Sequence, residues 1–494
     1  MRHTALKTLA TATQTPAATG YTYYLPDCQQ LTFDECYYGG KINGVFVKYI
    51  ENGDTIVFPA GSATWGYGAS ANNGRQTWIT HSITVTGQGD STVISIASEG
   101  KRYTLATINL WSTVTWSNMK IIGAPTGSQA TVFNSAPYNN SARQSGSVNP
   151  GINYTGGGRI TNVTFESPST NGPGYFFYGS SGLESFLIDN CRITANAGNA
   201  ELIFVRGPTN AWQVNNTLGG ANNIFVENCT FNTNGYVNDA NSNGRMVVRF
   251  CTINGPIKVD GHGLASNSAP ARGFRCMETY HNTWTYNAAS WTAIEIRGGT
   301  TMTFNNTTTN SYGNFFMTDY GAFQSLPNFG YAYQTPASYP ITDQVGVGKD
   351  PKVAASEPAY IWGNRVGASL SWRRQNKAIP QAAIDFYRTQ TGDPTSTYTE
   401  RDIVRANRDF YAEAGFETSA NGAPVEQQAA GVSIGTKAQM LAFTAPFTKY
   451  GWWVTDEGTW NRTPGGPQGR LYTWNGSSWN VYYEPYTYPH PLRT

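Results

Sequence analysis

One short strand pattern recurs three times in the middle of this chain, at residues 186–193, 224–231 and 246–253. Each copy has an apolar strand, a polar corner, a cysteine at the same place and a large apolar residue two positions later. The shared cysteines are Cys191, Cys229 and Cys251. A strand that repeats at intervals of a few tens of residues predicts a solenoid, in which each turn stacks on the one before it.

The composition suits a turn-rich β-protein. Charged residues are 13% of the chain, about half of the share of roughly 25% that is usual in globular proteins. The aromatic content of 14% is too high for a disordered chain. The net charge is only +2 and no basic stripe is visible, so nucleic acid is not expected as a partner. No segment approaches the roughly 18 apolar residues of a membrane span, so membrane insertion is not expected either.

The matching positions of the repeat predict which side chains face inward. Because Cys191, Cys229 and Cys251 share one register, we expect them to stack inside the solenoid as small apolar groups. No histidine accompanies them at the spacing of a metal site. Asn190 and Asn228 occupy one corner, and Asn tolerates a left-handed backbone there, which predicts an internal Asn ladder. Another two cysteines, Cys28 and Cys36, could form a disulfide, but nothing in the sequence requires it.

The chain divides by pattern into three parts. We expect an N-terminal attachment arm at 1–50, a solenoid with loop insertions and an end cap at 51–430, and a small aromatic-rich β module with a tail at 431–494. Within the last part, residues 436–442 are expected to form a short helix. The Asn475-Gly476 turn between two aromatic strands predicts a hairpin.

The repeats at 159–307 resemble those of the right-handed parallel β-helix superfamily, which includes pectate-lyase-like proteins and phage tailspikes. The resemblance covers roughly residues 50–365. Segments 259–263, 272–275 and 297–300, with the end at 488–492, look like those of bacterial and phage β-helix proteins that mostly lack an assigned activity. The aromatic motif within 453–479 is similar to a small module of phage tail and particle proteins. The resemblance implies an all-β fold, a right-handed parallel β-helix with a small C-terminal β-hairpin module.

The densest group of polar residues follows the third repeat and supplies the catalytic candidates. These are Asp260, His262, Arg272, Arg275 and Glu278, close to Lys258. If neighbouring turns bring them to one face, they offer the parts of a polysaccharide lyase acting on an acidic glycan. A cation would neutralise the uronate carboxylate, His262 or an Arg would remove the C5 proton, and an acid would assist the leaving group. Asp260 and Glu278 could then hold Ca²⁺. The simpler interpretation, which we favour, is that these residues form ion pairs that fix a loop.

Hydrolysis is a further alternative. The triplet 261–263 is similar to one in polygalacturonases, but their Asn-Thr-Asp, Asp-Asp and Arg-x-Lys motifs are missing here, which argues against that reaction. Asp319 could provide a second carboxylate in the same groove and so permit acid/base glycosidase chemistry. A capped turn is the simpler interpretation of Asp319.

Four residues are candidates for contacting a glycan: Arg297, Asp319, Tyr320 and Trp479. The C-terminal aromatic residues could stack on sugar rings. A small module also needs large aromatic side chains to build any core, since each buries about 150–250 Å². For most of these residues we therefore expect a place in the core.

The sequence favours a phage virion component, a tailspike, tail fibre or particle-surface protein that presents a β-helix to host-surface polysaccharide. The N-terminal arm would bind virion tail or capsid proteins, and the start of the chain is a poor secretory signal because it has no continuous apolar run. The alternatives are a secreted pectate-lyase-like enzyme and a non-catalytic decoration protein. No cofactor or resident metal is expected outside the lyase alternative. Tailspikes of this fold are usually trimers, but the sequence shows no trimer seam, and a homotrimer remains an open expectation.

Overall fold

The structure of the chain is a computed structural model. The described residues are 20–38, 41–42, 45–46, 50–65, 77–79, 81–96, 104–108, 113–123, 131–134, 157–168, 175–180, 185–207, 211–240, 243–255, 257–262, 273–285, 292–309, 314–317, 344–346, 348, 356–366, 373–375, 404–416 and 430–493. The chain forms two compact units. Among the described residues, the first contains those up to Phe204 together with Ile224–Val237, and the second contains the rest.

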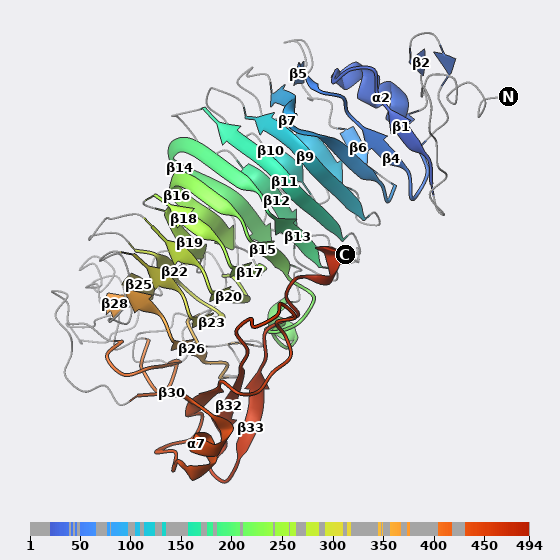
Figure 1. The fold of residues 1–494 in the computed structure, drawn as a ribbon. Coiled ribbons are helices and arrows are strands. Elements are labelled where there is room, and N and C mark those ends of the chain that lie inside the picture. Colours follow the sequence, from blue (N-terminus) through green and yellow to red (C-terminus); the bar gives the residue numbers. More distant parts are fainter. Residues whose placement is uncertain are drawn as a thin grey trace. The chain divides into compact units, whose positions relative to one another are not determined.

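The first unit is a stack of parallel strands, as the repeat predicts (Figure 1). Its strands are β1 (Thr22–Tyr24), β4 (Thr55–Val57), β5 (Gly61–Trp65), β6 (Thr77–Ile79), β7 (Thr84–Ile96), β8 (Thr104–Ile108), β9 (Val114–Ile122), β10 (Thr131–Asn134), β11 (Gly158–Ser167), β12 (Tyr175–Ser180), β13 (Phe186–Asp189), β14 (Arg192–Arg206), whose last two residues belong to the second unit, and β15 (Ile224–Glu227). One series pairs in the order β1, β4, β7, β9, β11, β13 and β15. The ladder therefore begins at β1, within the segment for which the sequence pattern predicts an arm.

A helix and a two-stranded ribbon accompany the start of this ladder. The helix is α2 (Gln30–Tyr38), and the ribbon pairs β2 (Lys41–Ile42) with β3 (Val45–Phe46). Phe33 of α2 is fully buried, with its ring 5.6 Å from Phe58, 5.5 Å from Trp65 and 6.0 Å from Trp116. Because the first turn of a solenoid has an open apolar end, Phe33 acts as a plug for it. The sequence pattern does not predict this helix.

The second unit arranges its solenoid strands in three parallel series. Its elements are β16 (Thr230–Ala240, from residue 238), η1 (Ala211–Gln213), β17 (Arg245–Arg249), β18 (Thr252–Asn254), β19 (Ile257–Gly261), β20 (Cys276–Tyr280), β21 (Thr283–Trp284), β22 (Ile294–Ile296), β23 (Thr300–Phe304), β24 (Thr307–Thr308), β25 (Asn314–Met317), β26 (Ala359–Trp362), β27 (Arg365–Val366), β28 (Arg373–Gln375) and β29 (Phe410–Ala412). The series are β17-β20-β23-β26-β29, β18-β21-β24-β27 and β19-β22-β25-β28. The fold is thus a parallel β-helix, as expected.

One corner has a left-handed backbone residue in the turns of β9, β11, β13 and β15 and in those of β17, β20, β23 and β26. In the first unit this residue is always Asn, with φ between 53° and 55°, at Asn118, Asn162, Asn190 and Asn228. In the second unit the same corner is occupied by Phe250, His281, Asn305 and Gly363. Asn and Gly tolerate this conformation best, which explains the recurring Asn in the sequence. The expected role of Asn190 and Asn228 as corner residues is confirmed.

The internal ladder lies one residue after that corner. Cys191, Cys229 and Cys251 fill this position and are buried, as expected. In later turns the position is taken by Asn282, Asn306 and Asn364. Their amides bond along the stack, with 3.0 Å from Asn282 Nδ2 to Asn306 Oδ1 and 2.9 Å from Asn306 Nδ2 to Asn364 Oδ1. The predicted Asn ladder therefore exists, but the expectation that the corner residues form it was wrong. A left-handed corner turns its own side chain outward and the next one inward.

The C-terminal part of the second unit is a four-stranded sheet with one helix. The elements are β30 (Val432–Gly435), α7 (Lys437–Ala442), β31 (Gly451–Val454), β32 (Arg470–Trp474), β33 (Trp479–Tyr483) and the final η4 (Pro491–Arg493). The predicted helix and the predicted hairpin of β32 and β33 are both confirmed. Thr436 starts α7 with a capping box to Gln439. One side of the sheet packs on the helix through Met440, Trp452, Val454 and Tyr472.

The other side of the sheet packs on the β-helix of the same unit. The Trp453 ring lies 5.0 Å from those of Phe304 and Trp362. The Tyr360 hydroxyl donates to the Lys449 carbonyl oxygen at 2.9 Å. The module is therefore joined to the solenoid by an aromatic seam over the β23-β26 strands.

Candidate functional site

Four charged side chains form a compact group on strands β19 and β22, here called the charge cluster: Lys258, Asp260, Glu295 and Arg297. Asp260 and Glu295 are directly opposite in the parallel ladder, so their strands lie about 4.8 Å apart there. Arg297 Nη2 donates to Asp260 Oδ2 at 2.6 Å, and Lys258 Nζ donates to Glu295 Oε2. A weaker contact of 3.5 Å joins Arg297 Nε to Glu295 Oε1.

Alternation along the strands explains this arrangement. Val259, Ile294 and Ile296 point into the solenoid and are fully buried, which turns the charged residues between them outward. Asp260 is nevertheless only 1% exposed, and its Oδ1 has no hydrogen-bond partner among the described residues. Asn238 holds the strand at this point, with its Nδ2 donating to the Asp260 carbonyl oxygen at 2.7 Å. The cluster offers two adjacent carboxylates and two cations in a charge-balanced set.

The Arg275 candidate has an internal role. Its guanidinium is fully buried and forms a two-pronged ion pair with Glu357, at 2.7 Å and 3.0 Å. Its remaining donors bond to the carbonyl oxygens of Ala211 at 2.9 Å and Val214 at 3.1 Å, and the group lies 5.4 Å from the Trp212 ring. Arg275 therefore fastens the 211–214 segment to the solenoid.

The Glu278 candidate joins three chain segments. Gly219 N donates to Glu278 Oε1 at 2.8 Å, and the Tyr483 hydroxyl donates to Glu278 Oε2 at 2.5 Å. The side chain is 1% exposed. Burial raises the pKa of Glu278 from 4.5 to about 7, although the bonds from Tyr483 and Gly219 and the charge of Arg249 oppose this rise. A carboxyl group with this pKa exchanges its proton near neutral pH.

The predicted catalytic residues that the structure describes do not all share one face. Asp260 belongs to the β19-β22 series, whereas Glu278 belongs to the β17-β20-β23 series and faces Tyr483. His262 directly follows β19 and is half-buried, with its backbone N–H donating to the Ala240 carbonyl oxygen at 2.9 Å. Arg272 lies outside the described residues. Asp260 and Glu278 therefore belong to different strand series although they are close in sequence.

Two of the four glycan-binding candidates, Arg297 and Trp479, lie within the described residues. Arg297 belongs to the charge cluster, while Asp319 and Tyr320 lie outside the described residues. Trp479 is half-buried on the C-terminal module, with its ring 5.5 Å from Trp474 and 6.3 Å from Trp452. It thus contributes to the small core, as expected for most aromatic residues there, and keeps part of its ring accessible.

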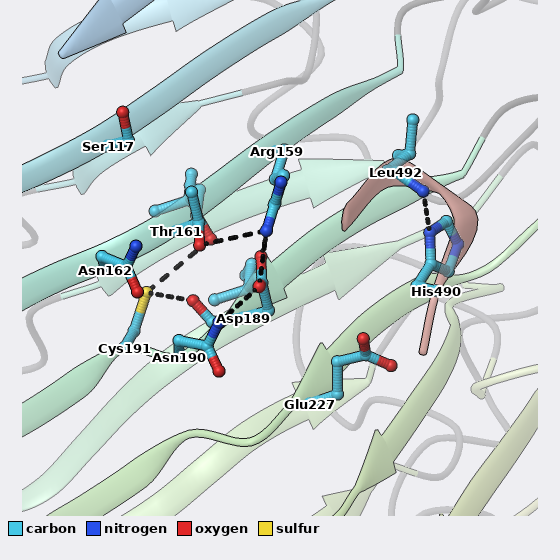
Figure 2. A network of polar contacts seen from close by, with 12 residues as sticks. Ser117, Arg159, Thr161, Asn162, Asp189, Asn190, Cys191, Glu227, His490 and Leu492 are labelled. Atoms are coloured by element: carbon cyan, nitrogen blue, oxygen red, sulfur yellow. Dashed lines mark hydrogen bonds and ion pairs between the residues drawn. The ribbon is translucent and has the colours of Figure 1, made fainter. Parts of the chain in front are cut away.

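The first unit has its own polar ladder on β11, β13 and β15 (Figure 2). Arg159 donates to Asp189 with two nitrogens, Nε to Oδ1 at 2.8 Å and Nη2 to Oδ2 at 2.9 Å. Asn190 Nδ2 donates to the same Oδ2 at 2.9 Å. Asp189 is fully buried, and so is Glu227, its neighbour in the ladder. Every Asp189 oxygen thus has a donor, which is the pattern of a structural ion pair.

No group of three or more His, Cys, Asp or Glu residues that could hold a metal ion occurs in the described part of the chain. All six cysteines are free thiols and buried, including Cys28 and Cys36.

Within the same described ranges, no helix is long and apolar enough to cross a membrane. Comparison of the chain with protein-family models, with curated proteins and with solved structures found no match.

Three contributors to these sites were not anticipated from the sequence: Glu295, Glu357 and Arg249. Glu295 carried a usable signal, because it stands between two isoleucines in a strand and must face away from them. Glu357 and Arg249 gave no such signal. Their partners are 82 and 237 residues away in the sequence, at Arg275 and Tyr486.

Proposed function

We propose that this protein is a phage virion component, a tailspike, fibre or particle-surface protein, and that its β-helix and C-terminal module contact host-surface glycan. The proposal rests on a fold of the kind that such proteins use and on the phage-like module motif within 453–479. Arg275 and Glu278 are committed to internal bonds, which favours a role in binding over catalysis.

The observation that carries the glycan-binding part is the tryptophan pair on the hairpin. Trp474 and Trp479 lie opposite each other across β32 and β33, and both rings are half-buried. Partly exposed aromatic faces on a rigid strand pair can stack on the apolar faces of sugar rings without losing much conformational freedom. The hairpin turn beside them, at Asn475, is exposed.

Binding to immobilised bacterial surface polysaccharides tests this part of the proposal. The double variant Trp474→Ala/Trp479→Ala should weaken binding by about tenfold or more, a loss of about 1.4 kcal/mol. Tyr24→Ala is the matched control, because Tyr24 is an exposed aromatic residue of the first unit. Equal affinity of the double variant and the control, with both folded, would exclude the tryptophan pair as the glycan contact.

Incorporation into particles tests the virion part. Removal of residues 1–19 leaves β1 and the Phe33 plug in place, so the solenoid should fold. We expect this truncated chain to be soluble and folded but missing from assembled particles. Normal incorporation would refute attachment through the N-terminal segment.

A polysaccharide lyase remains the second candidate, favoured by one feature of the charge cluster. Asp260 Oδ1 is buried without a hydrogen-bond partner among the described residues, beside Lys258 and Arg297 as cations. A lyase would generate unsaturated uronate ends that absorb in the ultraviolet. The absence of such product from a broad panel of acidic polysaccharides would exclude this candidate, and product from the wild type but not from Lys258→Met would support it.

A further inference from the structure

The last residues of the described chain return to the β-helix and lie along strands β17 and β20 of the second unit. We call residues 483–490 the C-terminal strap. Arg249 donates to the carbonyl oxygens of Tyr486 at 2.6 Å and Thr487 at 2.8 Å. The Tyr488 ring stacks on Phe250 at a centroid distance of 4.0 Å. At its other end, the strap contributes the Tyr483 hydroxyl to Glu278.

We propose that proton uptake by Glu278 controls how tightly the C-terminal strap docks on the β-helix. In the docked state the carboxyl group is 1% exposed and bonds to Gly219 and Tyr483. A protonated carboxyl group keeps both contacts when its own O–H donates to the Tyr483 oxygen while its other oxygen accepts from Gly219 N. An ionised one loses its hydration without full compensation, because burial of a charge is costly unless it is paired.

Among the described residues, the carboxyl group of Glu278 has two hydrogen bonds and no ion pair. The charge of Arg249 favours the ionised form, but its guanidinium bonds to the Tyr280 hydroxyl and to the two strap carbonyl oxygens rather than to Glu278. Cys276, on the same strand, is a buried neutral thiol that contacts Thr217. Burial raises the pKa of the Tyr483 phenol well above its usual value, so this group is neutral near pH 7. The ion pair of Arg275 and Glu357, on the neighbouring segment, balances itself.

Opening of the strap would return Glu278 to water and to its ordinary acidity. The pKa is about 7 in the docked state against an ordinary value of 4.5. The docked form therefore binds the proton more tightly than the open form. By linkage, the ratio of docked to open molecules falls by up to about 300-fold as the pH rises from 4.5 to above 7. The strap is held under mildly acidic conditions and loosened under neutral to alkaline ones.

Amide hydrogen exchange of the full chain between pH 5 and 9, corrected for intrinsic exchange rates, tests the proposal. Protection of residues 483–490 should fall with rising pH, while protection of β23 should stay constant. Glu278→Gln should keep the strap docked and remove the pH dependence, because an amide can make both hydrogen bonds without ionising. Tyr483→Phe should move the transition to higher pH, because the bond from Tyr483 favours the ionised form.

Glu457→Gln is the matched control. Glu457 also accepts a hydrogen bond from a tyrosine, Tyr472, at 2.5 Å, but it pairs with Lys437 near the surface and its pKa is lowered. This variant should leave the pH profile of the strap unchanged. Flat protection in the wild type, or an unchanged profile in Glu278→Gln, would overturn the proposal. If Glu278→Gln does not fold, an unmoved midpoint in Tyr483→Phe would overturn it instead.

Discussion

Arg249 donates a 2.6 Å hydrogen bond to the carbonyl oxygen of Tyr486, a residue 237 positions later in the chain. The Arg249 guanidinium is fully buried and also bonds to Thr487 and Tyr280. Removing it leaves two strap carbonyl oxygens without their donor. We expect Arg249→Met to cost about 3 kcal/mol of unfolding free energy in urea.

The control for this variant is Arg192→Met. Arg192 forms an exposed ion pair with Asp90 at 3.6 Å, with more than half of each side chain accessible. Exposed ion pairs of this kind contribute at most about 1 kcal/mol. Equal stability of the two variants would show that the strap contributes nothing to the fold of the second unit.

The amide ladder should be sensitive to removal of a single member. Asn306 Oδ1 accepts from the Asn282 backbone N–H at 3.1 Å as well as from its side chain, and Asn306 Nδ2 also donates to the Thr279 carbonyl oxygen. Asn306→Ala should therefore destabilise the protein by about 3 kcal/mol, measured by urea unfolding. Asn305→Gly, at the adjacent left-handed corner, should change the stability by less than about 1 kcal/mol.

His281 and Glu278 should have opposite effects on the pH dependence of stability. Burial lowers the pKa of His281 from 6.5 to about 4, so stability falls as the pH drops from 6.5 to 4. The pKa of Glu278 is raised to about 7, so stability falls as the pH rises from 4.5 to 7. Each effect is worth about 3 kcal/mol, and they largely cancel in the wild type.

Single substitutions separate the two effects. His281→Asn keeps the left-handed corner, where Asn is the usual residue, and should leave a protein that is more stable in acid than at neutral pH. Glu278→Gln should give the reverse slope. Unfolding free energies measured from pH 4 to pH 8 provide the check, and parallel profiles for the two variants would contradict the assignment.

A double-mutant cycle should show whether Asp260 and Arg297 in the charge cluster stabilise the fold by pairing with each other. Arg297→Met leaves the buried Asp260 carboxylate without its partner and should cost about 3 kcal/mol. The double variant Asp260→Asn/Arg297→Met should recover most of this loss. Additive losses of unfolding free energy would show that the two residues do not stabilise each other, and would favour a role in ligand binding.

The thiols should be inert in the native protein. All six cysteines are at most 3% exposed, and burial raises the pKa of Cys36 to about 12. We expect a thiol reagent at pH 8 to label none of them natively and all six in denaturant. Rapid labelling of one or two native thiols would show that a unit opens locally.

The local repeat was enough to predict the solenoid, the inward cysteines and the left-handed corners, because these depend on neighbours within one turn. The sequence does not predict that Asp260 and Glu278 lie in different strand series, since this depends on which series each strand joins. The partner of Glu278, Tyr483, is 205 residues away, and the two meet only because the C-terminal module folds back. Spacing along a sequence indicates a face of a strand, but not which distant segment covers that face.

The amide ladder also bears on how the chain tolerates long insertions. Asn306 and Asn364 bond at 2.9 Å although 58 residues separate them, against 24 between Asn282 and Asn306. A thiol stack constrains the register less tightly, because each sulfur contacts a carbonyl oxygen of its own turn, and only weaker contacts of Cys191 and Cys229 reach the turn before. Paired amides constrain it more tightly, because a slipped turn would bury unmatched donors and acceptors. The change from Cys to Asn therefore fixes the strand register of the later turns, including the two turns that a long connection joins.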